Sequence, residues 1–190
     1  MSSKQNEPFN FKKWGFFEVD AIKDLVNKFE DEWLIDTSRQ ETYETHRSTE
    51  SYFLYQTDLL WEPSKTFIVT KHEISSELED LVEPILSELE GLHDGQRGNV
   101  LFIKLKAGQS IPSHQDGGEY LNSVRRHHIA IVTSEGTKFG VGDEEIFMAE
   151  GECWEINNSR LHYVNNSSNT DRVHLLIDIM PNSELQEQNG

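Results

Sequence analysis

The sequence predicts a mainly-β domain whose N-terminal helices pack on the outside of a β-sheet. Two observations favour this class. After Gly95 the chain consists of short apolar runs separated by turns rich in glycine and asparagine, a rhythm typical of β-sandwiches and barrels. Before Gly95, two stretches repeat apolar residues at helical spacing. Because a sheet with a polar pocket on one face has an apolar back, we expect these helices to cover that back.

Each predicted helix has start or stop signals in the sequence. The first is expected over residues 20–34, with Asp20 as the N-cap. The second is expected over residues 75–89, capped by one of the two serines at its start and stopped by Gly91. Pro84 lies inside this second helix and predicts a kink or a break, because proline removes one backbone N–H.

The predicted strands divide the chain into three parts. We expect an N-terminal extension over residues 1–95, a β core over 96–181 and a flexible polar tail over 182–190. Two strands are expected between the helices and five in the core. They cover residues 52–55, 66–70, 99–106, 127–133, 145–148, 152–156 and 172–179.

Composition excludes several classes of function. The chain has 190 residues, of which 35% are hydrophobic, which suits one domain with a sizeable core. The formal net charge of −17 repels phosphate backbones, so nucleic acid is not an expected partner. No apolar run approaches the ~20 residues of a membrane span. With Cys153 as the single cysteine and no apolar leader, we expect a reduced, cytoplasmic protein.

The most informative pattern is His114-Gln115-Asp116 followed by His162. Two imidazoles and one carboxylate are the ligand set that holds non-haem Fe(II) and leaves positions open for a co-substrate and oxygen. In an extended chain His114 and Asp116 point to the same face. His162 begins a short strand after a turn, and an antiparallel neighbour can carry it to the same ion. These three residues are the predicted metal ligands and catalytic centre; Zn or Mn also suits them.

Three further residues predict a site for an anionic co-substrate beside that metal. Arg172 shares one face of a predicted strand with His174 and Asp178, and a guanidinium binds a carboxylate through two parallel hydrogen bonds. Arg126 and His128 share one face of another strand. Cations at two places near a metal suit a small dicarboxylate that is held at both ends.

An ordered set of motifs resembles the aspartyl/asparaginyl β-hydroxylase-like family. These enzymes are Fe(II)- and 2-oxoglutarate-dependent dioxygenases on a double-stranded β-helix, or jelly roll, which is a cupin-like fold. Bacterial cis-3 proline hydroxylases are similar. The resemblance covers roughly residues 99–180, and its motifs are residues 111–116, 126–128, 150–156, 162–166 and 171–178.

The resemblance implies a role for each site residue. It implies Fe(II) bound by His114, Asp116 and His162, and Arg172 on the distal carboxylate of 2-oxoglutarate. It implies that Arg126 and His128 help to bind this co-substrate, and that O2 is consumed while succinate and CO2 are released. Mammalian peptide-hydroxylating members lack the acidic ligand, so the presence of Asp116 points toward members that hydroxylate amino acids.

The substrate is the least specified part of the prediction. We expect a proline-like or other free amino acid, or an amino-acid side chain in a peptide or protein. The residues expected to meet it are Arg125, Trp154, His46 and Tyr120, the last on a mobile flap that follows two glycines. Two alternatives remain open: a non-catalytic cupin-like module that binds a metal or metabolite, and a zinc-dependent hydrolase. The oligomeric state is left open.

Overall fold

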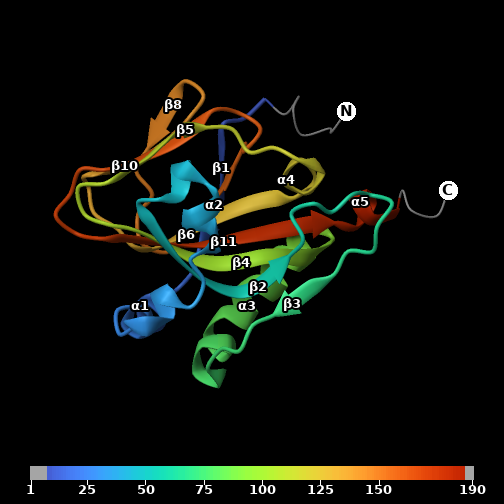
Figure 1. Ribbon diagram of the computed structural model, residues 1–190, viewed down its shortest axis with the longest axis horizontal. Helices are drawn as coiled ribbons and strands as arrows, with labels where there is room; N and C mark the ends of the chain where they lie inside the picture. The colour runs from blue at the N-terminus through green and yellow to red at the C-terminus, as the bar shows by residue number, and fades with distance from the viewer. Residues whose placement is uncertain (1–7, 187–190) are drawn as a thin grey trace.

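The computed structural model describes residues 8–186 and contains two antiparallel β-sheets (Figure 1). The strands are β1 (Phe11–Phe16), β2 (Thr49–Thr57), β3 (Val69–Lys71), β4 (Gly95–Leu105), β5 (Ser110–His114), β6 (Arg125–Val132), β7 (Thr137–Val141), β8 (Glu144–Ile146), β9 (Glu152–Ile156), β10 (His162–Asn166) and β11 (Arg172–Pro181). The large sheet has the order β1-β9-β6-β11-β4-β2-β3, and the small sheet has the order β5-β10-β7-β8. The predicted mainly-β jelly roll is therefore confirmed.

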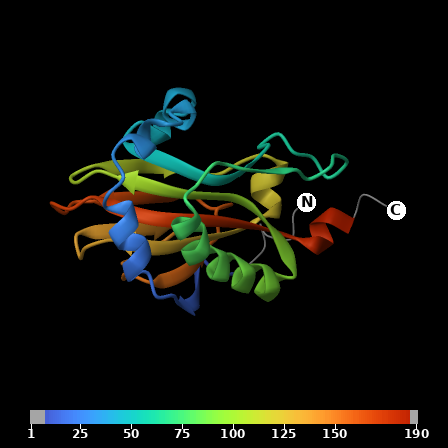
Figure 2. The same ribbon diagram turned by 90° about the horizontal axis from the view of Figure 1, so that it is seen from below.

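Helices cover the outer face of the large sheet, as the sequence predicted. The helical elements are α1 (Asp20–Val26), η2 (Asp31–Leu34), α2 (Ser38–Thr42), η3 (Glu44–His46), α3 (Ser76–His93), α4 (Glu119–Ser123) and α5 (Asn182–Gln186). Helices α1 and α3 lie across this outer face (Figure 2), whereas α2 lies on the side of the small sheet (Figure 1). Within residues 8–186, no helix has both the length and the apolar character that a membrane crossing requires.

The apolar residues that predicted the two helices form the largest buried cluster. Ile22 and Val26 of α1 and Leu86 of α3 pack with Phe102 of β4 and Leu175 of β11. Each of these side chains is at most 2% exposed, so burial of this face fixes both helices on the sheet. The same strands leave their other face for the space between the sheets.

Helix boundaries differ from the prediction in three places. The expected 20–34 helix divides into α1 and the 3-10 turn η2. Helix α3 begins as predicted, because the side chain of Ser75 accepts a hydrogen bond from the N–H of Leu78. The helix continues through Pro84 without a break. It passes the predicted stop at Gly91 and ends before Asp94, which adopts the left-handed conformation with φ 44°.

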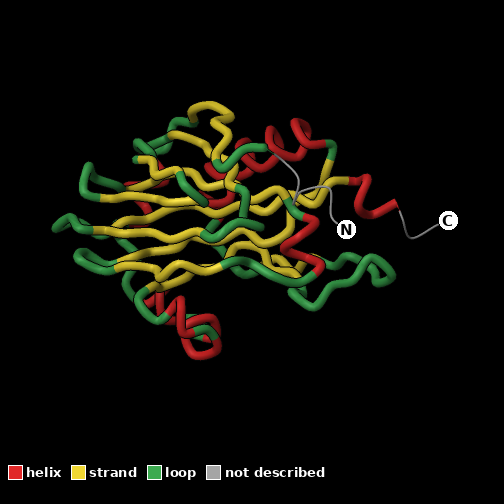
Figure 3. Tube along the Cα trace, turned by 90° about the horizontal axis from the view of Figure 1, so that it is seen from above, coloured by secondary structure: helices red, strands yellow, loops and turns green. Residues whose placement is uncertain are grey.

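Strands lie on both sides of the expected boundary at residue 95 and join the same large sheet, whose strands run side by side in Figure 3. β1 and β2 precede this boundary, yet they pair with β9 and β4 of the large sheet. β1, β5 and β7 were not among the predicted strands; β1 carries two lysines at the sheet edge, and β7 contains Gly140. The expected tail begins with α5, and residues 187–190 lie outside the described part of the chain.

Candidate metal centre and anion pocket

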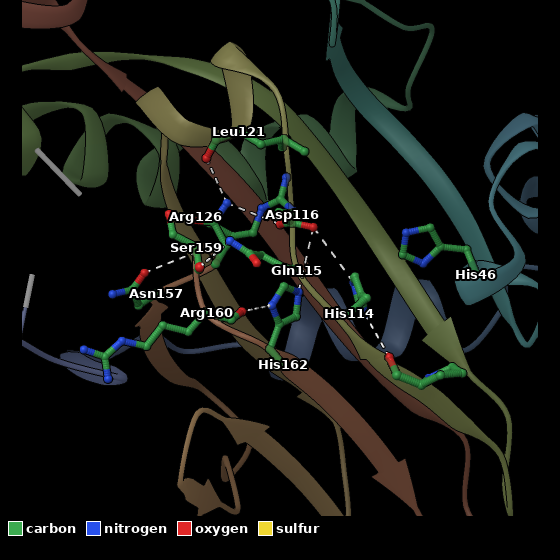
Figure 4. Close-up of polar contacts among 12 residues, drawn as sticks. His46, His114, Gln115, Asp116, Leu121, Arg126, Asn157, Ser159, Arg160 and His162 are labelled. Carbon is green, nitrogen blue, oxygen red and sulfur yellow. Dashed lines mark hydrogen bonds and ion pairs between the residues drawn. The ribbon is translucent and has the colours of Figure 1, made fainter. Parts of the chain in front are cut away.

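Two histidines face each other across neighbouring strands of the small sheet. His114 is the last residue of β5 and His162 is the first of β10, and the antiparallel register pairs them directly. Their ring centroids lie 4.2 Å apart. Asp116 follows β5, and one ligand atom from each of the three side chains lies within 4.8 Å of the other two (Figure 4). The structure thus brings together the three residues that the sequence predicted as metal ligands.

Both imidazoles turn the same nitrogen toward the carboxylate. Nδ1 of His114 lies 2.9 Å from the carbonyl oxygen of Pro112, and Nδ1 of His162 lies 2.9 Å from that of Arg160. Because a carbonyl oxygen only accepts, each Nδ1 carries the proton and each Nε2 keeps its lone pair. These Nε2 atoms lie 3.9 and 3.8 Å from Oδ1 of Asp116. Backbone hydrogen bonds of this kind commonly orient histidines that bind metals.

One carboxylate oxygen of Asp116 faces the two histidines, and the other accepts hydrogen bonds from neighbouring side chains. Oδ2 accepts hydrogen bonds from Nη1 of Arg126 at 2.5 Å and from Nδ2 of Asn158 at 3.3 Å. Burial by itself would raise the pKa of Asp116, but Arg126 and the neighbouring histidines more than offset it, so the pKa is lowered. The carboxyl group is therefore an anion at neutral pH, as a metal ligand must be.

Buried polar groups in turn hold Arg126. Its Nε and Nη2 each donate to the carboxylate of Asp178 at 2.8 Å. Oδ2 of Asp178 also accepts from the hydroxyl of Tyr120 at 3.1 Å, and this hydroxyl accepts from the backbone N–H of Asn99 at 2.8 Å. Asp178 and Tyr120 are both fully buried. These contacts fix the guanidinium that orients Asp116.

Arg172 is a buried guanidinium without a carboxylate partner among the described residues. It is 2% exposed, its Nη2 donates to Nδ1 of His174 at 2.8 Å, and its Nε has no hydrogen-bond partner. Its guanidinium carbon lies 5.6 Å from the ring centroid of Phe139. Burial lowers the pKa of Arg172 to about 9, which still leaves a cation at neutral pH. A buried cation without a counter-charge is costly, so this site is suited to an anion.

One pocket contains both the histidine–aspartate group and Arg172. His128 also lines it, and burial followed by the charge of Arg172 lowers the pKa of His128 well below its ordinary value. The walls between these polar groups are apolar. The lining residues are Arg39, His46, Ile103, Ile111, His114, Asp116, Arg126, His128, Phe139, Ile156, His162, Val164, Arg172 and Leu176. The histidine–aspartate group and Arg172 therefore share one pocket that suits a small anion.

Arg125 does not line this pocket, although we expected it to meet the substrate. Alternation along β6 places Arg125 and Arg126 on opposite faces of the large sheet. Nη1 of Arg125 donates to Oε1 of Glu155 at 3.1 Å, and Glu155 is fully buried. Arg125 is therefore a counter-charge on the helix-covered face.

Two other expected substrate residues have structural partners outside the pocket. Trp154 packs edge-on against Phe11, with ring centroids 6.3 Å apart, and its Nε1 donates to Glu152 at 3.0 Å. Tyr120 is buried and holds Asp178. The fourth expected residue, His46, does line the pocket.

The sequence did not single out Arg39, His174 or Asp178 as site residues. His174 and Asp178 share the face of β11 that carries Arg172, as strand alternation predicted, but alternation alone did not give either residue a role. Arg39 lies in the short helix α2, whose sequence has too little periodicity to show which residues face the pocket.

A second group of possible metal ligands lies on the face of the large sheet that is opposite the pocket. The Nε2 atoms of His93 and His127 lie 2.9 Å apart, near Glu155. The two oxygens of Glu155 already accept hydrogen bonds from Trp14 and Arg125. The carboxylate of this group is therefore engaged by Trp14 and Arg125, whereas the first group opens into a pocket.

A family model supports a functional interpretation of the pocket. The model described as Aspartyl/Asparaginyl beta-hydroxylase matches residues 19–181, a range that contains every residue lining the pocket. No curated protein has a significant similarity to the sequence.

Solved structures that are similar to this chain have little sequence identity to it. A Pseudomonas putida prolyl-4-hydroxylase is 9% identical, with a TM-score of 0.60 over 91% of this chain and 94% of that one. The viral collagen prolyl hydroxylase vCPH from Paramecium bursaria Chlorella virus-1, in a 2OG complex, is 13% identical, with a TM-score of 0.52 over 92% and 97%. A match to AerE from Microcystis aeruginosa, 22% identical with a TM-score of 0.35, covers 43% of this chain and only 35% of AerE.

Proposed function

The chain belongs to the aspartyl/asparaginyl β-hydroxylase family of dioxygenases, and on this premise we propose that it is an Fe(II)- and 2-oxoglutarate-dependent hydroxylase of an amino acid. The substrate is either a free amino acid, proline-like or other, or an amino-acid side chain within a peptide. One observation carries the proposal: a histidine–aspartate–histidine group and a buried arginine without a counter-charge line the same pocket.

The donor set fits Fe(II). Two neutral imidazole nitrogens and one carboxylate oxygen converge, and the protons of His114 and His162 are on the nitrogens that point away. Three protein ligands on one side of an octahedral ion leave three positions for other molecules, which is the arrangement of non-haem iron oxygenases. We therefore assign His114, Asp116 and His162 as the iron ligands. Zinc prefers similar donors, so metal-loading experiments must exclude it.

Arg172 suits the distal carboxylate of 2-oxoglutarate. A guanidinium can donate two parallel hydrogen bonds to a carboxylate, and Nε of Arg172 has no partner within the protein. His174 fixes the orientation of the guanidinium by accepting from Nη2. The structural similarity to vCPH, a protein solved with 2OG, is consistent with this co-substrate. His128 lies on the same pocket face and stays neutral, so it contributes hydrogen bonding without charge.

Arg126 has a different role in our proposal from the one that the sequence suggested. Three of its N–H groups are already engaged by Asp116 and Asp178. We therefore assign Arg126 mainly to the orientation of the ligand carboxylate. Its place in the pocket lining still allows a remaining N–H to contact the co-substrate.

When bound, Fe(II) would supply the activation of O2. One oxygen atom would be incorporated into succinate as 2-oxoglutarate loses CO2, and the other would be inserted into a C–H bond of the substrate. The protein supplies position and exclusion of water. Ile103, Val164 and Leu176 form apolar walls between the ionic groups, so charges in the pocket act in a low-dielectric surrounding.

Isotope labelling tests the proposed function. Protein reconstituted with Fe(II) and 2-oxoglutarate under ¹⁸O2 is offered free amino acids and short peptides. We expect one compound to gain a single ¹⁸O atom in step with succinate release. Succinate release that never depends on any added compound, or activity that requires Zn instead of Fe(II), would contradict the proposal.

A further inference from the structure

We propose that Arg39 and His46 form a subsite that binds a carboxylate of the substrate at the edge of the pocket. This inference rests on the function proposed above and adds a substrate class to it: molecules that present a carboxylate close to the carbon to be hydroxylated. The argument depends on contacts of the α2–η3 segment that the metal and co-substrate do not use.

Arg39 is a second cation in the pocket without an acidic partner among the described residues. Its Nη1 donates to the hydroxyl of Ser51 at 3.0 Å, and its Nη2 donates to Nε2 of His46 at 3.2 Å. Both partners are neutral. Burial, followed by the charge of Arg126, lowers the pKa of Arg39 to about 10, so it remains a cation at neutral pH. Unlike Arg97, which pairs with Glu83 and Glu90, Arg39 has charge to offer to a ligand.

His46 adds an unused hydrogen-bond donor beside this cation. A guanidinium only donates, so Nε2 of His46 accepts from Arg39 and the ring proton is on Nδ1. Nδ1 of His46 is buried and has no hydrogen-bond partner. A buried donor without a partner is unfavourable, and a carboxylate oxygen would satisfy it.

The pair lies next to the proposed metal centre. The ring of His46 meets that of His114 edge-on, with centroids 5.7 Å apart and an interplanar angle of 87°. Figure 4 shows His46 on the far side of His114 from Asp116 and Arg126. Arg172, in contrast, is buried within the pocket at 2% exposed. A ligand held by Arg39 would therefore lie near the metal without competing for Arg172.

The charge of the pocket also favours an anionic substrate. Three arginines, at positions 39, 126 and 172, line the pocket, and two carboxylates, those of Asp116 and Asp178, both pair with Arg126. The pocket thus has one net positive charge before any ligand binds. Fe(II) adds two positive charges and 2-oxoglutarate two negative ones, so one positive charge remains. A substrate carboxylate beside Arg39 offsets this charge locally, which matters most in a low-dielectric site.

Two sources can supply this carboxylate: the α-carboxylate of a free amino acid, or an acidic side chain in a peptide. The experiment separates them with three probe sets: the free L-amino acids, their carboxamides, and N-acetylated aspartyl and glutamyl amides. The readout is the increase in succinate release that each probe causes with Fe(II), 2-oxoglutarate and O2. The variants are Arg39→Gln and Arg39→Lys, with Arg47→Gln as the control. Arg47 is an exposed arginine of the same segment, and within residues 8–186 its acidic partner is Glu44.

We expect a carboxylate probe to stimulate succinate release, and we expect the matched amide not to stimulate it. Arg39→Gln should raise the KM of that probe about 10- to 100-fold and abolish discrimination against the amide. Arg39→Lys should restore part of the discrimination, and Arg47→Gln should match the wild type. Stimulation by free amino acids alone identifies an α-carboxylate, whereas stimulation by the aspartyl or glutamyl amides identifies a side chain.

The inference would be overturned by equal turnover of acid and amide, by an unchanged KM in Arg39→Gln, or by no stimulation by any carboxylate probe. Loss of 2-oxoglutarate binding in Arg39→Gln would also overturn it, because Arg39 would then hold the co-substrate. If the wild type itself binds no 2-oxoglutarate with Fe(II), the proposed function fails instead, so the two failures are distinguishable.

Discussion

Nη1 of Arg126 lies 2.5 Å from Oδ2 of Asp116, on the carboxylate oxygen that the two histidines do not share. This contact determines which oxygen remains for a metal. It depends in turn on Asp178, which holds Arg126 through two further hydrogen bonds. The geometry of the proposed iron site is thus set by residues that the iron does not touch.

Removing the negative charge of Asp178 should weaken metal binding. In Asp178→Asn the guanidinium of Arg126 loses its main anchor, and Asp116 loses its fixed orientation. We expect the affinity for Fe(II), measured by anaerobic calorimetry, to fall about 10- to 100-fold. Glu83→Gln is the matched control, since it removes from Arg97 of β4 the carboxylate of Glu83 on α3. Equal affinities in both variants would show that Asp178 does not position the ligand.

Arg172→Met should separate stability from function. It removes a buried cation that has no counter-charge, so the free energy of unfolding of the ligand-free protein should rise by on the order of 1 kcal/mol. The same change should weaken 2-oxoglutarate binding about 10- to 100-fold and leave Fe(II) binding intact. Urea unfolding and calorimetry measure the two effects. A destabilised Arg172→Met variant with normal co-substrate affinity would be evidence against our assignment.

Stability should fall as the pH drops below the ordinary histidine pKa. Burial, with Arg172 next, lowers the pKa of His128 and His174 well below 6.5. Such a histidine takes up its proton in the unfolded chain first, so stability is intact above about pH 6.5 and decreases below it. Each histidine contributes up to about 1.4 kcal/mol per pH unit in this range. Urea unfolding at pH 7.5, 6.5 and 5.5 measures the slope, which His174→Gln should reduce; a flat profile would contradict the prediction.

Arg125→Gln should affect stability and spare catalysis. Arg125 lies on the opposite face of β6 from the pocket and pairs with the fully buried Glu155. We expect the free energy of unfolding to decrease by about 1 to 3 kcal/mol, because the buried carboxylate loses a charged donor. KM values for co-substrate and substrate should not change. A large increase in either KM would place Arg125 at the site after all.

Strand alternation made part of the site predictable. It identified His114 with Asp116, and Arg172 with its neighbours on one face of a strand, because the side-chain period of a strand is fixed by the backbone. The pairing of His162 opposite His114 could not be derived, since register depends on contacts between distant segments. Arg125 was expected at the site because of its charge, although strand alternation places its side chain on the opposite face from that of Arg126.

Residues in short or irregular segments were harder to place. The two glycines before Tyr120 suggested a flap that would present this residue to the substrate, whereas Tyr120 is fully buried and supports Asp178. A side chain at Gly98 would place its Cβ 2.3 Å from the hydroxyl of Tyr120, a close approach that no local pattern shows. Arg39 belongs to a five-residue helix, too short to have a periodic face.

The most direct test of the account is the absorption of the anaerobic protein with Fe(II) and 2-oxoglutarate. Chelation of the iron by this 2-oxo acid produces a weak visible charge-transfer band. We expect the band in the wild type, its absence in His162→Ala, and its appearance in Arg172→Met only at much higher 2-oxoglutarate concentration. No band in the wild type, or an unchanged band in His162→Ala, would contradict the assignment of His114, Asp116 and His162 as the iron ligands.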